Sequence, residues 1–566
     1  MLAVLMAGCG PSKGRVHGLG SVYGGVFNFN QTQLVRSLFP LSITLVSEQH
    51  IAMQVYEGLV RFNSKNLQVE PALAESWEVD PTHTIYTFHL REGVRFHDDP
   101  AFPDGIGREL TAGDVVHCFT ALCEQGVGDA MFWILQEKVA GADAYHNAGK
   151  KGGPVSGIQA LDERTVQITL VRPFPNFLQS LAVAGCTIWP RELPGTYGTD
   201  LIQHAIGTGP FRLAAARPGE AIVLERNPNY WGRDAQGRQL PYLDAVRITL
   251  DPDKEKEVAA FLAGRLSMVN ELSPESVEVL ADSLDPVTGR RRFNLLATPA
   301  LAVQYYCFNL SKPPFSDARV RRAFAMALDR RALVDSIMQG LATPAEHGLV
   351  APGLDGYPYH LVAGIPYDPE GARRLLAEAG YPGGKGFPRV QLQVDNNGFG
   401  YRSMATMAQD MLVKELRVAV TVSTVPTNVY YERIEHGEAL FWREGWVADL
   451  PDAENILALL YGKNAVADTS MTSVFNTTRY ASPRYDEQFS KARAVDDSAK
   501  RMHHLAQADH FAMQDVPVVP LYHERYTMLV APKVVGLHIN AMELLDLREV
   551  RLRPEAAHTS AADTTS

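Results

Sequence analysis

The stretch that decides the fold class begins at Asp368-Pro369-Glu370, which predicts the start of a helix. Gln391-Leu-Gln-Val394 then predicts a strand, residues 402–416 keep helical spacing, and Ala419-Val-Thr-Val422 predicts a second strand. An Asp at the N-cap followed by Pro in the first turn is a typical helix start. Because helices and strands alternate in this way when helices cover a sheet, the stretch predicts an α/β domain.

Similar patterns extend in both directions along the chain. Thr111-Ala-Gly-Asp114 opens an amphipathic helix that continues to Leu122, and Thr84-Ile-Tyr-Thr-Phe-His-Leu90 alternates as a half-buried strand does. Ser316-Asp317 caps one predicted helix that ends at Gly340, and residues 498–515 predict another. The α/β pattern therefore covers much of the chain.

Composition sets the class of protein. The 566 residues are 46% hydrophobic and 21% charged, an ordinary globular composition at a length that implies more than one domain. The net charge is −11 with a pI near 5.9, and no basic stripe is present, which argues against nucleic acid as a partner. No window after the N-terminus resembles a transmembrane helix of about 20 apolar residues.

The five cysteines divide into two groups. Cys9 follows Leu5-Met-Ala-Gly, which resembles a bacterial lipoprotein signal whose Cys is acylated. No Lys or Arg precedes the apolar run, which is also short for a signal, and a start codon assigned too late would explain both departures. The alternative is an ordinary disordered N-terminus. The remaining cysteines are expected to be buried free thiols: Cys118, Cys123, Cys186 and Cys307.

Arg443-Glu-Gly-Trp446-Val-Ala-Asp449 places a cation, an aromatic ring and an anion at equal intervals. Asp449 can pair with an ammonium group, and Arg443 can pair with a carboxylate through its planar guanidinium. Trp446 can cover an apolar chain between them. A ligand with both a free amino end and a free carboxylate needs such groups, but the alternative is that Arg443 and Asp449 pair only with protein groups.

Several short segments follow one another in a distinctive order. They are Pro71-Ala-Leu-Ala-Glu-Ser-Trp77, Tyr86-Thr-Phe-His-Leu-Arg-Glu-Gly-Val-Arg-Phe-His97, Leu110-Thr-Ala-Gly-Asp-Val-Val116, Gly207-Thr-Gly-Pro-Phe211, Leu224-Glu-Arg-Asn-Pro-Asn-Tyr-Trp231, Pro241-Tyr-Leu-Asp244, Pro314-Phe-Ser-Asp-Ala-Arg-Val-Arg-Arg-Ala323, Tyr367-Asp-Pro369, Gly445-Trp-Val-Ala-Asp449 and Val516-Pro-Val-Val-Pro-Leu521. Their order and spacing resemble the family 5 solute-binding proteins, the oligopeptide, dipeptide and nickel receptors of ABC importers. The resemblance covers about residues 25 to 545.

This resemblance implies an α/β, two-lobe periplasmic-binding-protein fold that closes about a hinge, with the larger lobe split into two subdomains. The larger lobe, lobe I, would be built from both ends of the chain and a middle segment. The expected division is a signal or lipoprotein tether at 1–20, lobe I subdomain a at 21–69, 206–296 and 521–553, lobe I subdomain b at 70–205, lobe II at 297–520 and a disordered tail at 554–566. One departure from the family is an inserted Gly- and Pro-rich segment from Asp98 to Arg108, expected on the surface.

The resemblance also implies roles for individual residues. By position, Asp449 would pair with the α-amino group of a peptide, and Arg443 would contribute to its carboxylate end. Trp446 is expected in the cleft wall. Five further residues are candidates to line the cleft, with ordinary packing as the alternative: Tyr305, Phe308, Asn309, Tyr430 and Tyr431.

The resulting expectation is a monomeric, non-enzymatic receptor in the periplasm or tethered outside the cell by an N-terminal lipid. It would deliver short peptides to ABC permease subunits, with the ATPase on a separate chain. No P-loop, His-Glu-x-x-His or Gly-x-Ser-x-Gly occurs, and no cofactor or metal is expected. Two alternatives remain: the same fold binding a metal chelate, haem, opine or oligosaccharide, or a signalling or chaperone-like protein that does not transport.

Overall fold

The structure is a computed structural model of the chain. It describes residues 22–553 apart from 33–34, 149–153, 199–203, 271, 273–291, 355, 396–399, 467–471 and 474. The predicted tether, including Cys9, and the predicted tail therefore lie outside the described residues.

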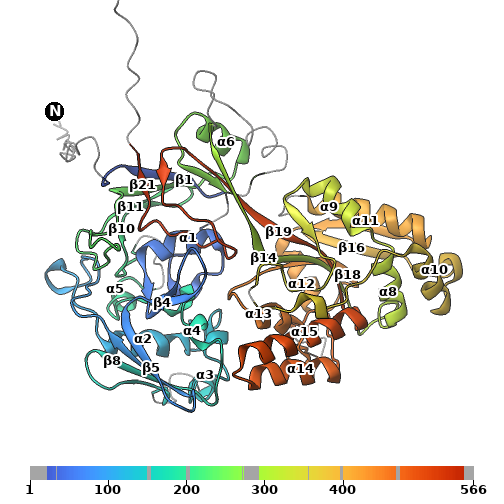
Figure 1. The fold of residues 1–566 in the computed structure, drawn as a ribbon, viewed down its shortest axis with the longest axis horizontal. Helices are drawn as coiled ribbons and strands as arrows, with labels where there is room; N and C mark the ends of the chain where they lie inside the picture. The colour runs from blue at the N-terminus through green and yellow to red at the C-terminus, as the bar shows by residue number, and fades with distance from the viewer. Residues whose placement is uncertain are drawn as a thin grey trace, which may run out of the picture.

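The molecule has two lobes joined by two long strands (Figure 1). The N-terminal half of the chain and the segment after about residue 530 form one lobe, and the middle of the chain forms the other. We keep the names lobe I and lobe II for them. The two-lobe α/β architecture predicted from the sequence is confirmed, whereas the exact limits of the seven segments remain predictions.

Lobe II is organised around a mixed seven-stranded sheet. Its central strands pair antiparallel, whereas β16 pairs parallel with both β17 and β18, as strands do when helices connect them. The strands are β13 (Met268–Asn270), β19 (Val518–Val530), β14 (Asn294–Phe308), β18 (Phe441–Val447), β16 (Val390–Asp395), β17 (Val420–Val425) and, at the side of β19, β15 (Ala342–Pro344).

Strands β14 and β19 pass from one lobe to the other and pair along most of their length (Figure 1). At one end they pair with each other and with β13, and at the other end β14 pairs with β18. The register of the β14–β19 ladder breaks between Pro299 and Val303. We expect a hinge between the lobes at this break, because the two connecting strands do not pair with each other there.

Lobe I contains two separate four-stranded sheets. In the first, β1 and β12 pair parallel and the other strands antiparallel; the second is antiparallel throughout. The first comprises β1 (Val26–Asn30), β12 (Ala245–Thr249), β11 (Ala221–Arg226) and β10 (Phe211–Arg217), and the second β5 (Ala74–Val79), β6 (Ile85–Leu90), β8 (Thr165–Thr169) and β7 (Ile158–Ala160); short pairs are β2 (Glu57–Gly58) with β9 (Thr187–Ile188), β3 (Val60–Phe62) with β4 (Val69–Pro71), and β20 (Val534–Val535) with β21 (Arg551–Leu552).

Helices follow the predicted starts, with one correction. The single helix predicted from Asp317 to Gly340 is two helices, because the side chain of Asp329 accepts a hydrogen bond from the Ala332 backbone N–H and caps a new helix. The helices are α1 (Val46–Val55), α2 (Ala112–Leu122), α3 (Ala142–Ala148), α4 (Phe177–Ser180), α5 (Leu193–Tyr197) and α6 (Lys254–Leu262) in lobe I, and α8 (Ala318–Met326), α9 (Arg330–Met338), α10 (Pro369–Glu378), α11 (Tyr401–Leu416), α12 (Thr427–Glu435), α13 (Ala453–Leu457), α14 (Pro483–Ala494) and α15 (Ser498–Asp515) in lobe II.

The inserted segment from Asp98 to Arg108 is anchored rather than loose. Phe102 is buried against Phe96, while Ile106 is exposed. A Cβ at Gly107 would lie only 1.9 Å from the backbone oxygen of Phe96, so the segment can approach this closely only with glycine there. The segment was predicted on the surface, and the structure places only part of it there.

Arg108 connects the inserted segment to α2. Its guanidinium donates to both carboxylate oxygens of Asp114, at 2.6 and 2.7 Å, and to Glu192 at 2.8 and 2.9 Å. Asp114 is fully buried and also accepts from the Thr111 backbone N–H and hydroxyl, which completes the cap of α2. One carboxylate thus fixes both the helix start and the insertion.

The four cysteines that the structure describes are buried and free, as predicted: Cys118, Cys123, Cys186 and Cys307. In the described ranges, no helix is long and apolar enough to cross a membrane.

Replacing Asp114 by Ala should lower the free energy of unfolding of lobe I by about 3 kcal/mol, because Arg108 loses its buried partner and α2 loses its cap. Urea denaturation followed by circular dichroism measures the change. Glu92→Ala is the matched control: its pair with Arg164 is exposed on both sides, so less than about 1 kcal/mol should be lost. Equal losses in the two variants would contradict the role given to Asp114.

Candidate functional site

A cavity of about 490 Å³ lies between the lobes. Lobe II contributes the end of β18 and the residues that follow it, together with α13 and the end of α14. Lobe I contributes the start of α1 and the segments around residues 130–138 and 183–185. Its charged lining residues among those described are Glu137, Lys138, Asp449, Glu454 and Arg493.

Asp449 and Trp446 both line this cavity and share one partner, Asn455 of α13. The Asn455 amide nitrogen donates to Asp449 Oδ2 at 3.3 Å. The Asn455 amide oxygen accepts from the Trp446 indole N–H at 2.8 Å and from the Asp449 backbone N–H at 3.1 Å. A single amide therefore sets the orientation of the indole and of the loop that carries the carboxylate.

No cation of the described chain forms an ion pair with Asp449. Asp449 lines the cavity and is solvent-exposed in this arrangement of the lobes, so the cavity walls remove only part of the hydration of its carboxylate. This desolvation raises the pKa of Asp449 above its ordinary value, and the hydrogen bond from Asn455 offsets only part of the rise. A carboxylate in this state gains free energy when an ammonium group enters the cavity.

The two neighbouring acids, Asp452 and Glu454, are neutralised by Arg501 of α15. Arg501 donates to both oxygens of Asp452, at 2.5 and 2.8 Å, and to Glu454 at 2.6 Å, and all three side chains are largely buried. Asp452 also caps α13 by accepting from the Glu454 backbone N–H. Of the three acids grouped here by the sequence, only Asp449 lacks a cation within the part of the chain described.

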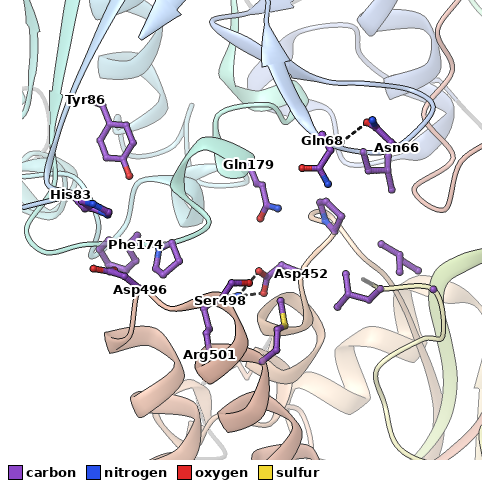
Figure 2. A pocket seen from close by; sticks show the side chains of 17 residues that line it. Asn66, Gln68, His83, Tyr86, Phe174, Gln179, Asp452, Asp496, Ser498 and Arg501 are labelled. Atoms are coloured by element: carbon purple, nitrogen blue, oxygen red, sulfur yellow. Dashed lines mark hydrogen bonds and ion pairs between the residues drawn. The ribbon is translucent and has the colours of Figure 1, made fainter. Parts of the chain in front are cut away.

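A second cavity of about 480 Å³ lies on the other side of this ion cluster (Figure 2). Gln68, Tyr86 and Gln179 face it from lobe I, and Asp452 and Arg501 face it from lobe II. The stretch 449–454 separates the two cavities: Asp449 and Glu454 line the first, and Asp452 lines the second.

Three polar contacts connect the lobes beside the first cavity. Arg493 of lobe II lies 3.6 Å from the carboxylate of Glu137 in lobe I and 3.4 Å from Glu454 on its own lobe. The Arg172 guanidinium donates to the backbone oxygen of Arg493 at 2.8 Å. The Asn176 amide donates to Glu454 at 3.5 Å. The ion pair with Glu137 and the hydrogen bond from Asn176 are long, so these contacts hold the two lobes together only weakly.

Arg443 does not line either cavity. It is buried inside lobe II, donates to Asp395 at 3.1 Å and to Gln304, and stacks on the ring of Tyr401 with 3.4 Å between the guanidinium carbon and the ring centroid. Arg443 and Trp446 both lie on β18, and an odd spacing along a strand sends side chains to opposite faces. The structure thus brings Trp446 and Asp449 together and separates Arg443 from them.

The other predicted cleft residues are also placed away from the cavity lining. Tyr305 and Tyr430 belong to a buried cluster of lobe II. Asn309 is fully buried and donates to the backbone oxygens of Gly437 and Ala439 at 2.9 and 3.3 Å. Their contacts match the packing alternative stated for them, and a role at the ligand stays a prediction.

Sequence reasoning missed Asn455, Lys138 and Arg493. Asn455 had a weak signal, since it lies two residues into the helix that Asp452 caps. Lys138 and Arg493 come from segments far from the motif in sequence, and nothing in their local pattern indicates that they share its cavity. In the described ranges, no group of three His, Cys, Asp or Glu residues could hold a metal ion.

Two lobes with a cavity between them, lined by a carboxylate that forms no ion pair within the described ranges, are typical of a protein that captures a small solute. The chain matches the bacterial extracellular solute-binding proteins, family 5 Middle, over residues 68–468. It belongs to this family, whose members are receptors rather than enzymes.

Several known proteins are similar to the chain over most of its length. The chain is 29% identical over 503 residues to heme-binding protein A of Haemophilus influenzae, covering 86% of this chain and 84% of the relative. It is 29% identical over 504 residues to the dipeptide-binding protein of Escherichia coli, covering 87% and 88%. Among solved structures, the periplasmic binding protein DppA from Helicobacter pylori in complex with the peptide STSA has a TM-score of 0.77 at 25% identity, covering 94% and 99%.

Replacing Asp449 by Asn should raise the melting temperature of the ligand-free protein near pH 7. A carboxyl whose pKa is higher in the folded state than in the unfolded state destabilises the fold once pH exceeds the unfolded value near 4, and Asn removes that cost. Below that pH both forms are neutral, so the gain should disappear. Differential scanning calorimetry at several pH values measures it.

Asp452→Asn serves as the matched control for this variant. It weakens the pairing with Arg501 and should lower the melting temperature at neutral pH. A fall in melting temperature for Asp449→Asn at pH 7 would show that its charge is compensated in the ligand-free protein.

Proposed function

We propose that this receptor binds short peptides and delivers them to an ABC importer, with the peptide α-amino group paired to Asp449. The observation that carries the proposal is a carboxylate in the interlobe cavity that forms no ion pair with the described residues, beside an indole that can cover the first residue of a ligand. An entering ammonium group supplies a positive charge, and its charge-assisted hydrogen bond to Asp449 strengthens when the ligand displaces water from this exposed carboxylate.

The similarity to peptide receptors supports this assignment. The relative from Escherichia coli is a dipeptide-binding protein, and the structural neighbour from Helicobacter pylori holds a tetrapeptide. A haem ligand is the second candidate, because heme-binding protein A is as similar in sequence. The unpaired acid favours a cationic ligand group, which a peptide N-terminus has and the haem propionates lack.

Transport would proceed by closure of the lobes around the ligand. Ligand that contacts both lobes shifts an open–closed equilibrium toward the closed form, and the closed surface is what permease subunits in the membrane would recognise. We further propose that the protein acts as a monomer outside the cytoplasm, tethered through an acylated Cys9, with the ATPase on another chain. Mass spectrometry of the intact protein from cells tests the acylation.

Short peptides should raise the melting temperature of the protein by mass action, whereas haem should not. A di- to pentapeptide library screened by differential scanning fluorimetry, with haem in parallel, makes the comparison. A shift with haem and none across the peptide library would overturn the peptide assignment.

Asp449→Asn should weaken peptide binding by about 30-fold or more, because it removes one partner of a desolvated charge pair. Isothermal titration calorimetry with the best library peptide measures the loss. N-acetylation of that peptide should cost the unmodified protein a similar factor and should cost the Asn variant little more. Independent, additive losses would mean that the amino group binds elsewhere.

A further inference from the structure

The cavity that Asp449 lines also contains a lysine whose ammonium group contacts backbone carbonyl groups rather than a carboxylate. Its positively charged lining residues, within the described chain, are Lys138 and Arg493. Arg493 is shared between Glu137 and Glu454. Lys138 forms no ion pair with any residue that the structure describes: its ammonium group donates to the backbone oxygens of Trp133 and Ile134, both at 3.1 Å.

The position of Lys138 follows from the local backbone. It comes after the short helix η3 (Phe132–Ile134), whose last carbonyl groups it caps. Glu137 before it has a positive φ of 56°, which sharply reverses the chain. Lys138 then carries its side chain back over Trp133, with its ammonium 5.5 Å from the ring centroid.

Burial disfavours the charged form of the Lys138 side chain. The side chain is largely buried, and its desolvation lowers the pKa of Lys138 to about 8, against a partial upward effect of the Glu454 charge. An ammonium group has three N–H donors, and the structure gives partners to two of them. At neutral pH the group is therefore protonated, poorly hydrated and able to accept one further anionic partner.

We propose that Lys138 receives the terminal carboxylate of the bound peptide, as the counterpart of Asp449 on the opposite lobe. This inference rests on the proposed function and adds a residue that selects ligands with a free carboxylate. Lys138 lies between η3 and α3 of lobe I and Asp449 lies between β18 and α13 of lobe II, so a zwitterion that pairs with both would connect the lobes. Arg443, to which the sequence assigned the carboxylate, is instead occupied by Asp395, Gln304 and Tyr401.

The test compares di-, tri- and tetra-alanine with their C-terminal amides, by isothermal titration calorimetry, on the unmodified protein, Lys138→Met and Lys138→Arg. The unmodified protein should bind the best free acid about 30-fold or more tightly than its amide. Lys138→Met should lose most of this preference by weakening the acid alone, and Lys138→Arg should restore it. Lys138→Gln provides a second neutral variant if the Met variant unfolds, as melting curves will show.

Arg493→Met is the matched control, because it removes a cavity cation that the protein itself uses. It should weaken acid and amide by the same factor, through loss of the interlobe contacts. If the unmodified protein binds acids and amides equally, or if Lys138→Met keeps the preference, the role of Lys138 is refuted while peptide binding stands. If none of the alanine peptides binds, both proposals fall.

Discussion

The buried ion cluster of Arg501 with Asp452 and Glu454 is the interaction on which the site depends. Three charges removed from water are stable only when they compensate one another with good geometry, and Arg501 provides three donated bonds of 2.5 to 2.8 Å. The cluster fixes the start of α13, and α13 carries the amide of Asn455 to the loop of Asp449. The cluster also leaves Arg501 fully engaged with Asp452 and Glu454.

The fold was largely predictable from the sequence because its signals are local. Caps such as Asp368 and alternation in segments such as 84–90 need only neighbouring residues to be recognised. The error at residues 317–340 was also local: an Asp inside a long apolar pattern, Asp329, could be an exposed helical residue or a new cap, and only its hydrogen bond to Ala332 decides.

Only the site residues that lie close together in one short sequence motif could be predicted. Trp446 and Asp449 are close in sequence and line one cavity, whereas Arg443 lies on the opposite face of the strand. Equal spacing in sequence was a misleading guide, because three residues along a strand separate side chains that point to opposite faces. Lys138 enters the cavity from the other lobe, and no pattern within one chain segment reveals that two lobes meet.

The break in the β14–β19 ladder has a mechanical consequence. At its centre, the Leu301 backbone N–H donates to the Ala541 oxygen at 2.7 Å, while the Leu301 oxygen accepts from the Ala448 N–H at 2.8 Å. Ala448 directly precedes Asp449, so only one peptide unit separates the residue that bonds to Leu301 from the carboxylate of the cavity. A ligand bound at Asp449 would therefore lie one peptide unit and one backbone hydrogen bond away from the interruption in the ladder.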